Sequence, residues 1–200
     1  TNPMPPTQWS YNKTLKDAPY DPEKAKTLLK EAGVPENQEF NLWYMPVQRP
    51  YNPNAKLMAE MVQADWAKVG VKAKLVTYEW GEYPKRAQKG EPDAIIVGWT
   101  GDNGDPDNWL GTLLSCEAVG GNNYSRWCNK DFDKLVVNGK RTNDHDQRVA
   151  DYEQAQVIFK EQLPWTTMAH SVVTVFATPN VKDYKISPFG SVRFDGVKVE

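Results

Sequence analysis

The feature that most restricts the possible folds is an alternation of strand-like and helix-like segments between residues 39 and 114. These segments follow one another in the order 39–47, 54–69, 71–80, 82–89, 93–99 and 107–115. Residues 71–80, VKAKLVTYEW, alternate in the way of a strand with one exposed face. The run 93–99, DAIIVGW, is short, apolar and β-branched, which predicts a buried central strand. Strands that alternate with helices form β-α-β units, so the sequence predicts an α/β fold with a largely parallel sheet.

Two helices in the first half have clear boundaries. Asp21 and Pro22 are typical of a helix start, and Gly33 of a helix end. The segment 54–69 is amphipathic and stops at Gly70. Its apolar side consists of Leu57, Met58, Met61, Val62, Trp66 and Val69. An amphipathic helix buries such a side against the core.

The second half is mainly helical up to Pro164. A short helix is expected near 130–137, and Lys140 and Arg141 are expected in a solvated turn after it. A longer helix is predicted over 145–162, with an inward stripe of Val149, Tyr152, Ala155, Gln156 and Phe159. Beyond Pro164 the sequence WTTMAHSVVTVFAT is strand-like, and the remaining residues form a turn-rich tail that ends in an alternating strand.

Charge and hydropathy exclude some classes of partner. The formal net charge is −2, the pI is near 5.8, and no basic block is present, so no nucleic-acid partner is expected. No apolar run approaches the roughly 18 to 20 residues of a membrane span, so we expect a soluble protein without direct membrane insertion. The first residues, TNPMPPTQWSYN, are polar and proline-rich, unlike a signal peptide, and read as a mid-chain segment.

Two unusual loops follow predicted strands. QRPYNPN contains Arg49 together with two prolines, a tyrosine and two asparagines, and GDNGDPDN contains Asp102 directly after the apolar run. Ligands of parallel sheets bind beyond the carboxyl ends of the strands, where both loops are expected. An arginine offers a bidentate fork to a carboxylate, and an aspartate accepts hydrogen bonds from an ammonium, so the pair would suit a zwitterion. A structural Arg49–Asp102 salt bridge would use the same two residues and stays open as an alternative.

Metal and catalytic arrangements are poorly supported. Asp102, Asp105 and Asp107 are close in sequence, but the distal glutamate of a calcium loop is missing. We expect Asp107 to cap the following helix and Asp105 to lie in the turn before it. His145 and His170 are outside any metal motif and are interpreted as surface or structural residues. No nucleophile elbow, dinucleotide loop or phosphate loop is present, so neither an enzyme, a metal nor a cofactor is expected.

The two cysteines, Cys116 and Cys128, enclose eleven residues that include the turn-forming stretch Gly120–Asn123. This spacing does not match a zinc pair. A disulfide is favoured over two free buried thiols, and it would imply an oxidising compartment.

Several long segments resemble the extracellular solute-binding family 5, the periplasmic peptide-binding proteins of bacterial ABC importers. They include YDPEKAKTLLKEAG, MPVQRPYNPNAKLMAEMVQADWAKVGV, VTYEWGEY, GWTGDNGDPDN, NYSRWC and RVADYEQAQVIFKEQLP. The resemblance implies a type II periplasmic-binding-protein fold, with a mixed sheet flanked by helices, and a carboxy-terminal fragment of a two-lobed protein. Residues 1–178 would form part of the ligand-binding lobe, and 179–200 a tail that returns to the other lobe.

The same resemblance implies site residues and partners. Asp102 would bind the amino terminus of a dipeptide and Arg49 its carboxylate, before delivery to an inner-membrane ABC permease. Tyr51, Trp80 and Trp99 would line the side-chain pockets, although core packing explains these three aromatic residues nearly as well. Haem or another small ligand of the same family, or a fragment without independent binding, remain as alternatives.

Overall fold

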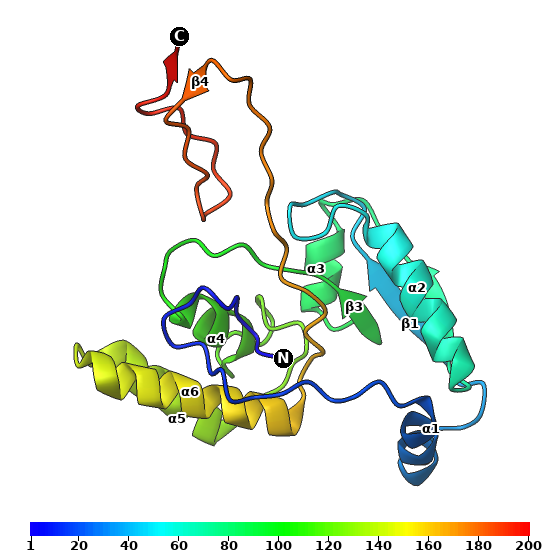
Figure 1. Cartoon of the computed structure of the whole chain (residues 1–200). Helices are drawn as coiled ribbons and strands as arrows, with labels where there is room; N and C mark the ends of the chain where they lie inside the picture. The colour runs from blue at the N-terminus through cyan, green and yellow to red at the C-terminus, as the bar shows by residue number, and fades with distance from the viewer.

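The computed structural model describes all 200 residues, and a parallel three-stranded sheet lies at the centre of its first half (Figure 1). β1 (Glu39–Tyr44) lies between β2 (Lys72–Val76) and β3 (Ala94–Ile96). Both pairings are parallel, with Leu42 opposite Leu75 on one side and Ala94 on the other. The predicted α/β fold with a parallel sheet is therefore confirmed.

The strand predicted to be central is an edge strand. β3 has three residues, pairs with β1 alone, and is followed by Val97, which is 40% exposed. Only Ile96 of this strand is fully buried, in a cluster with Leu42 and Ala59. An apolar run shows that a segment is buried on at least one face, but not how many neighbours it has.

α2 (Ala55–Lys68) and α3 (Tyr83–Gln88) connect the strands. The N-cap of α2 is Asn54, whose side chain accepts the N–H of Leu57. The apolar side predicted for this helix is wrong in part, because Leu57 and Met61 are 51% and 62% exposed. The helix instead buries Ala55 and Ala59, whose small side chains let it approach the sheet closely. Other members of the predicted side, Met58, Val62 and Trp66, do pack against the sheet.

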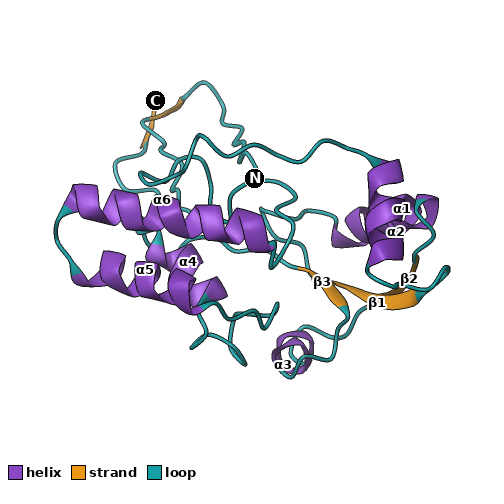
Figure 2. Ribbon diagram, turned by 90° about the horizontal axis from the view of Figure 1, so that it is seen from below, coloured by secondary structure: helices purple, strands orange, loops and turns teal.

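The second half forms a helical unit beside the sheet (Figure 2). It consists of α4 (Asp107–Leu114), α5 (Lys130–Arg141) and α6 (His145–Gln162). Its core contains Leu110, Leu114, Phe132, Val136, Tyr152, Ala155 and Phe159. α6 has the predicted bounds. α5 is longer than expected, so the predicted turn at Lys140 and Arg141 is wrong: both lie in the last helical turn, where basic side chains interact favourably with the helix dipole.

A disulfide joins Cys116 and Cys128, with an S–S distance of 2.03 Å, as the sequence predicts. It links the segment that follows α4 to the segment that precedes α5. None of the helices combines the length and the hydrophobicity that a membrane-spanning helix needs.

The polar member of the α6 stripe anchors the start of the chain. The buried Gln156 Oε1 accepts from Asn2 Nδ2 at 2.8 Å and from the N–H of Asn12 at 3.0 Å, and Gln156 Nε2 donates to the carbonyl of Ser10 at 2.7 Å. α1 (Pro22–Glu31) has Asp21 as its N-cap and Pro22 as its first residue, as predicted, but it buries none of its own residues.

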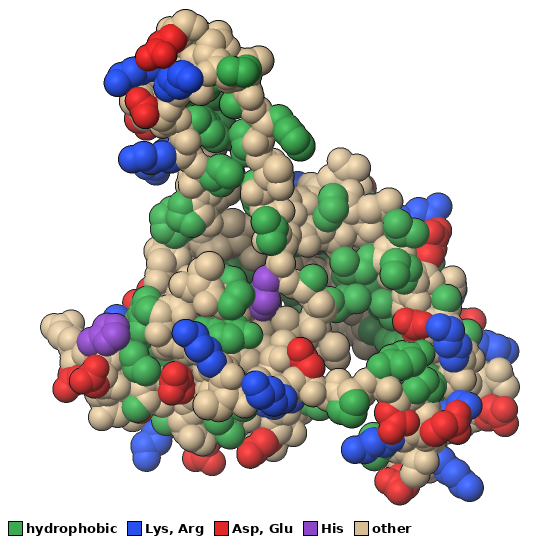
Figure 3. Space-filling model, in the orientation of Figure 1, with side chains coloured by type: hydrophobic (Ala, Val, Ile, Leu, Met, Phe, Trp, Pro, Cys, Tyr) green, Lys and Arg blue, Asp and Glu red, His purple; other side chains and the backbone are tan.

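The strand predicted over 165–178 is not formed, because this segment has no neighbouring strand to pair with. The tail beyond it projects from the body of the molecule (Figure 1). It holds only the short antiparallel pair β4 (Val181–Lys182) and β5 (Lys198–Val199). Figure 3 shows apolar side chains exposed along this projecting region. Phe194, in the tail, is 70% exposed, and Phe176, just before it, is 93% exposed.

Candidate ligand-binding site

The two charged residues singled out by the sequence lie on neighbouring loops. Arg49 follows β1 and Asp102 follows β3, and these two strands pair directly. Both loops therefore leave the same carboxyl-terminal edge of the parallel sheet, as predicted. Arg49 is half-buried and Asp102 is exposed. The alternative of a structural salt bridge between them is not realised, and neither side chain forms an ion pair elsewhere.

The backbone around Arg49 closes a tight turn. The N–H of Arg49 donates to the carbonyl of Asn52 at 3.1 Å, and the N–H of Asn52 donates back to the carbonyl of Arg49 at 2.9 Å. Asn52 is 3% exposed and anchors the turn. The Arg49 guanidinium donates from Nη1 to the carbonyl of Gln48 at 3.1 Å and lies over the ring of Trp80, with Cζ 4.8 Å from the centroid.

The three aromatic residues of the prediction occupy different surroundings. Trp80 stacks on the buried Tyr83, with ring centroids 6.0 Å apart and planes 18° apart. Tyr51 packs on the backbone of Gly98, where a Cβ atom would collide with its ring. Burial raises the pKa of Tyr51, while the charge of Arg49 acts in the opposite direction. Trp80 and Tyr51 therefore border Arg49, and Trp99 lies beside Asp102.

Asn108, in the first turn of α4, organises the Asp102 side of the site. Its Oδ1 accepts from Trp99 Nε1 at 2.8 Å and from the N–H of Asp102 at 2.9 Å. Its Nδ2 donates to Asp102 Oδ2 at 3.2 Å. Asn108 is not among the predicted site residues, although an amide at the start of a helix next to a candidate ligand loop is a usable signal.

The other two aspartates of this loop have structural partners. The prediction that Asp107 caps α4 is wrong, because Pro106 is the N-cap and Asp107 falls in the first turn. Asp105 Oδ1 accepts the N–H of Asp107 at 3.0 Å, so it performs the capping. Asp105 also pairs with Arg148 at 2.5 Å, and Asp107 pairs with Lys140 at 3.1 Å. Asp102 alone among the three has no cationic partner.

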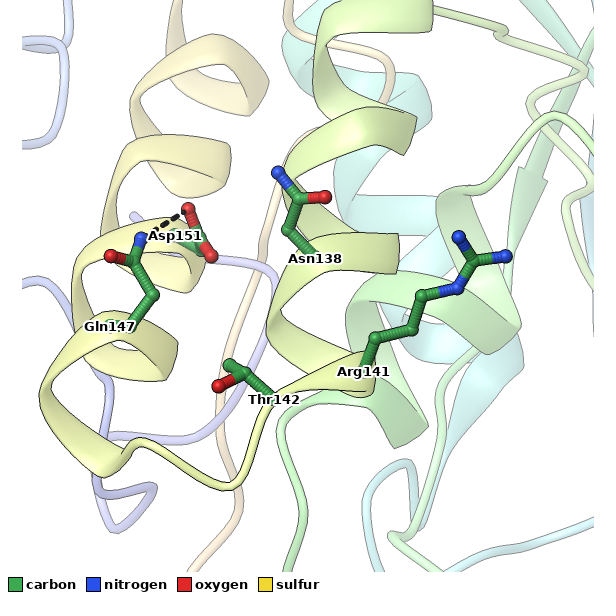
Figure 4. Close-up of a pocket in the computed structure, with 5 residues that line it drawn as sticks. All are labelled: Asn138, Arg141, Thr142, Gln147 and Asp151. Carbon is green, nitrogen blue, oxygen red and sulfur yellow. Dashed lines mark hydrogen bonds between the residues drawn. The ribbon is translucent and has the colours of Figure 1, made fainter.

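A cavity of about 260 Å³ opens between the end of α5 and the start of α6, away from the predicted site. It is lined by Asn138, Arg141, Thr142, Gln147 and Asp151 (Figure 4). Asp151 accepts a hydrogen bond from Gln147 Nε2 at 3.1 Å, and Arg141 points away from both. None of the residues predicted to bind ligand lines it.

A second cavity, of about 300 Å³, adjoins the Asp102 loop. Its lining is entirely polar and consists of Asn103, Asp105, Asp107, Asn108, Lys140 and Arg148. Because its charges are already paired with one another, we locate the candidate site at the strand ends, where Arg49 and Asp102 remain unpaired.

The chain is similar to known proteins over its whole length. The family described as bacterial extracellular solute-binding proteins, family 5 Middle, matches residues 1–121. "Di/tripeptide-binding protein 1" of Pseudomonas aeruginosa is 64% identical over 100% of this chain and 37% of its own length. "Heme-binding protein A" of Haemophilus influenzae is 52% identical over 100% of this chain and 36% of its own length.

Among solved structures, the dipeptide-binding protein of a Pseudoalteromonas species in complex with Met-Leu superposes with a TM-score of 0.85. It is 36% identical, and the match covers 100% of this chain and 39% of that protein. The chain thus spans well under half the length of the proteins that it matches.

Proposed function

Since the chain belongs to family 5 of the bacterial extracellular solute-binding proteins, we propose that it forms part of the ligand-binding lobe of a periplasmic dipeptide-binding protein. The intact protein captures dipeptides and delivers them to an inner-membrane ABC permease, without chemical conversion of the ligand. In this proposal residues 1–178 belong to the ligand-binding lobe and residues 179–200 return to the other lobe. The likeness to a di/tripeptide-binding protein and to a structure that holds Met-Leu supports this assignment.

One observation carries the proposal: two unpaired charges of opposite sign lie at the same edge of the sheet. Arg49 presents a guanidinium for the carboxylate of the ligand, and Asp102 presents a carboxylate for its ammonium. Charge-assisted hydrogen bonds of this kind are roughly twice as strong as neutral ones. Recognition of both ends also sets a length limit, because a longer peptide cannot place both of its termini against the two loops.

The aromatic residues serve the side chains of the ligand. Tyr51, Trp80 and Trp99 lie on the same loops as the charged residues or immediately beside them, and each is only partly buried. Aromatic rings give apolar surface with little loss of rotamer freedom, which suits a site that accepts many dipeptides. They line the side-chain pockets while the charged loops read the termini.

The haem-binding relative supports a second candidate function, the binding of haem by the same lobe. The two functions make different demands on the site. A haem has propionate carboxylates for Arg49 but no ammonium for Asp102. A haem titration of the purified protein, followed by its visible absorbance, separates the candidates.

The test uses the full-length protein and calorimetry with three probes: Met-Leu, its carboxy-terminal amide and its N-acetyl derivative. The wild type should prefer Met-Leu to both derivatives. Arg49→Ala should cost about 2 to 5 kcal/mol of binding free energy for Met-Leu, because truncation leaves a desolvated charge unpaired, and it should cost little for the amide. Asp102→Ala should show the mirror pattern, with little effect on the N-acetyl ligand.

Melting temperatures measured on the same variants distinguish ligand binding from a structural role. If Arg49→Ala melts far below the wild type and binds Met-Leu and its amide equally poorly, Arg49 does not bind the ligand carboxylate. If the wild type binds haem and none of the three peptides, the protein binds haem and not dipeptides.

A further inference from the structure

The guanidinium of Arg49 is held by an aromatic stack that continues into the core. Its Cζ lies 4.8 Å above the ring of Trp80, and Trp80 stacks on Tyr83. Tyr83 is 1% exposed, and its ring centroid lies 5.7 Å from the ring centroid of Trp43, which is 3% exposed. Trp80 therefore connects the half-buried arginine to buried rings of the core, and these contacts restrict its position.

The stack on Trp80 compensates for the flexibility of the arginine side chain. The side chain is long and has many rotamers, whereas a bidentate contact with a carboxylate requires a fixed guanidinium plane. An aromatic face attracts the cation and restricts its position, while the N–H groups at the edge of the guanidinium stay available for a ligand. Trp80 can perform this role and still offer its own edge to a side chain of the ligand.

The carboxylate of Asp102 is held by a different device. Asn108 Oδ1 receives two hydrogen bonds, from Trp99 Nε1 and from the backbone N–H of Asp102, and both of these groups can only donate. If the Asn108 amide were flipped, its NH₂ group would face the two N–H donors, so its orientation is fixed. Asn108 Nδ2 is consequently directed at Asp102 Oδ2, at 3.2 Å.

Asn108 belongs to a helix, whereas Asp102 lies on an exposed loop. The hydrogen bonds between Asp102 and Asn108 therefore restrict the motion of the Asp102 carboxylate relative to α4. The Asn108 amide occupies one carboxylate oxygen, and Asp102 Oδ1 has no protein partner.

We infer that Trp80 and Asn108 are positioning residues for the two ends of the ligand: Trp80 orients Arg49 toward a carboxylate, and Asn108 orients Asp102 toward an ammonium. The inference rests on the proposed function of Arg49 and Asp102. It assigns to each charged residue one uncharged partner, and it predicts that the two partners act on separate ends of the same ligand.

The experiment measures two ratios in the full-length protein: the affinity for Met-Leu over its amide, and the affinity for Met-Leu over its N-acetyl derivative. Trp80→Leu keeps an apolar side chain but removes the aromatic face, so it should lower the first ratio about threefold to tenfold and leave the second unchanged. Trp80→Phe, which keeps an aromatic face, should retain part of the first ratio.

Asn108→Ala removes a hydrogen bond to a charged group and should lower the second ratio about tenfold while leaving the first unchanged. Each variant is thus the matched control for the other, because a general loss of folding would weaken the binding of all three ligands by the same factor and leave both ratios unchanged. In an Arg49→Ala background, Trp80→Leu should have no further effect on the first ratio.

The outcomes separate this inference from the function beneath it. A wild type that does not distinguish Met-Leu from its derivatives overturns both. A wild type that distinguishes them, with Arg49→Ala and Asp102→Ala behaving as proposed, upholds the function. In that case Trp80 and Asn108 variants that keep both ratios, or that lower both equally, overturn the positioning roles.

Discussion

Two buried tyrosines, Tyr83 and Tyr152, differ in whether their hydroxyl groups have a hydrogen-bond partner. Tyr152 accepts from Arg148 Nη2 at 3.4 Å, whereas Tyr83 has none, and burial raises the pKa of both phenols. Tyr83→Phe should leave the free energy of unfolding unchanged or raise it by up to about 1 kcal/mol, because it removes an unsatisfied polar group. Urea unfolding measures the change.

The matched control is Tyr152→Phe, which should lower the free energy of unfolding by about 0.5 to 1.5 kcal/mol, because it removes a hydrogen-bond acceptor of Arg148. Equal losses for the two substitutions would mean that the hydroxyl of Tyr83 is hydrogen-bonded in solution.

Gly98 is required by its contact with Tyr51. A methyl group at this position would collide with the ring of Tyr51, so Gly98→Ala should destabilise the fold by about 1 to 3 kcal/mol, as overpacking typically does. Gly104→Ala is the control. A Cβ atom added at Gly104 would have open space around it, so this substitution should be close to neutral. Thermal unfolding of both variants checks this, and a stable Gly98→Ala would show that the Tyr51 ring moves freely.

For single residues, the sequence predicted that Arg49 and Asp102 lie at the same edge of the sheet, because the ends of adjacent parallel strands share one edge. It did not identify Asn108. The role of Asn108 depends on the loop folding back so that the N–H of Asp102 and the indole of Trp99 meet one amide oxygen. Such a meeting is a property of the tertiary structure, and the sequence shows only that Asn108 lies near a helix start beside the candidate loop.

Among the elements, the link between α4 and α5 depends on the disulfide. Cys116 and Cys128 are separated by 12 positions, for which the chain-entropy relation gives about 3 kcal/mol of stabilisation. Replacing both cysteines with serine should therefore lower the free energy of unfolding by about that amount. Urea unfolding of the oxidised wild type and of the double variant measures the difference.

A reducing agent supplies the control for the disulfide. The reduced wild type should fall to the stability of the double variant, which should not respond to the reagent. No difference between the oxidised wild type and the double variant would mean that the disulfide adds nothing to the stability of this region.

The type of a secondary-structure element was easier to predict from the sequence than the neighbours against which the element packs. The bounds of α6 follow from capping and periodicity, with Asp144 as N-cap and Leu163 as the first residue beyond the helix. The buried side of α2 could not be predicted, because Ala55 and Ala59 are weakly apolar and face the sheet in place of Leu57 and Met61. The edge position of β3 and the unpaired state of 165–178 likewise depend on neighbours that a single segment does not encode.

For the whole molecule, the contrast between the packed body and the projecting tail has a measurable result. Phe176 and Phe194 are 93% and 70% exposed, whereas Phe132 and Phe159 are buried. Limited digestion of the 200-residue chain with chymotrypsin should therefore cleave first within 165–200. Mass spectrometry of the early products identifies the sites.

The full-length protein provides the comparison for this digestion. If the tail returns to the other lobe, as we propose for residues 179–200, the bonds within residues 179–200 should resist cleavage there. Early cleavage in α5 or α6 of the isolated chain, with an intact tail, would contradict the arrangement in Figure 1.

The reciprocal backbone hydrogen bonds between Arg49 and Asn52 have a consequence for the time course of binding. A turn already closed before the ligand arrives does not have to rearrange during the encounter, so association should be similar for all dipeptides. Closely related complexes generally differ more in their dissociation rates than in their association rates. Under the proposed function, preferred and poor dipeptides would then differ mainly in how long they stay bound at this turn.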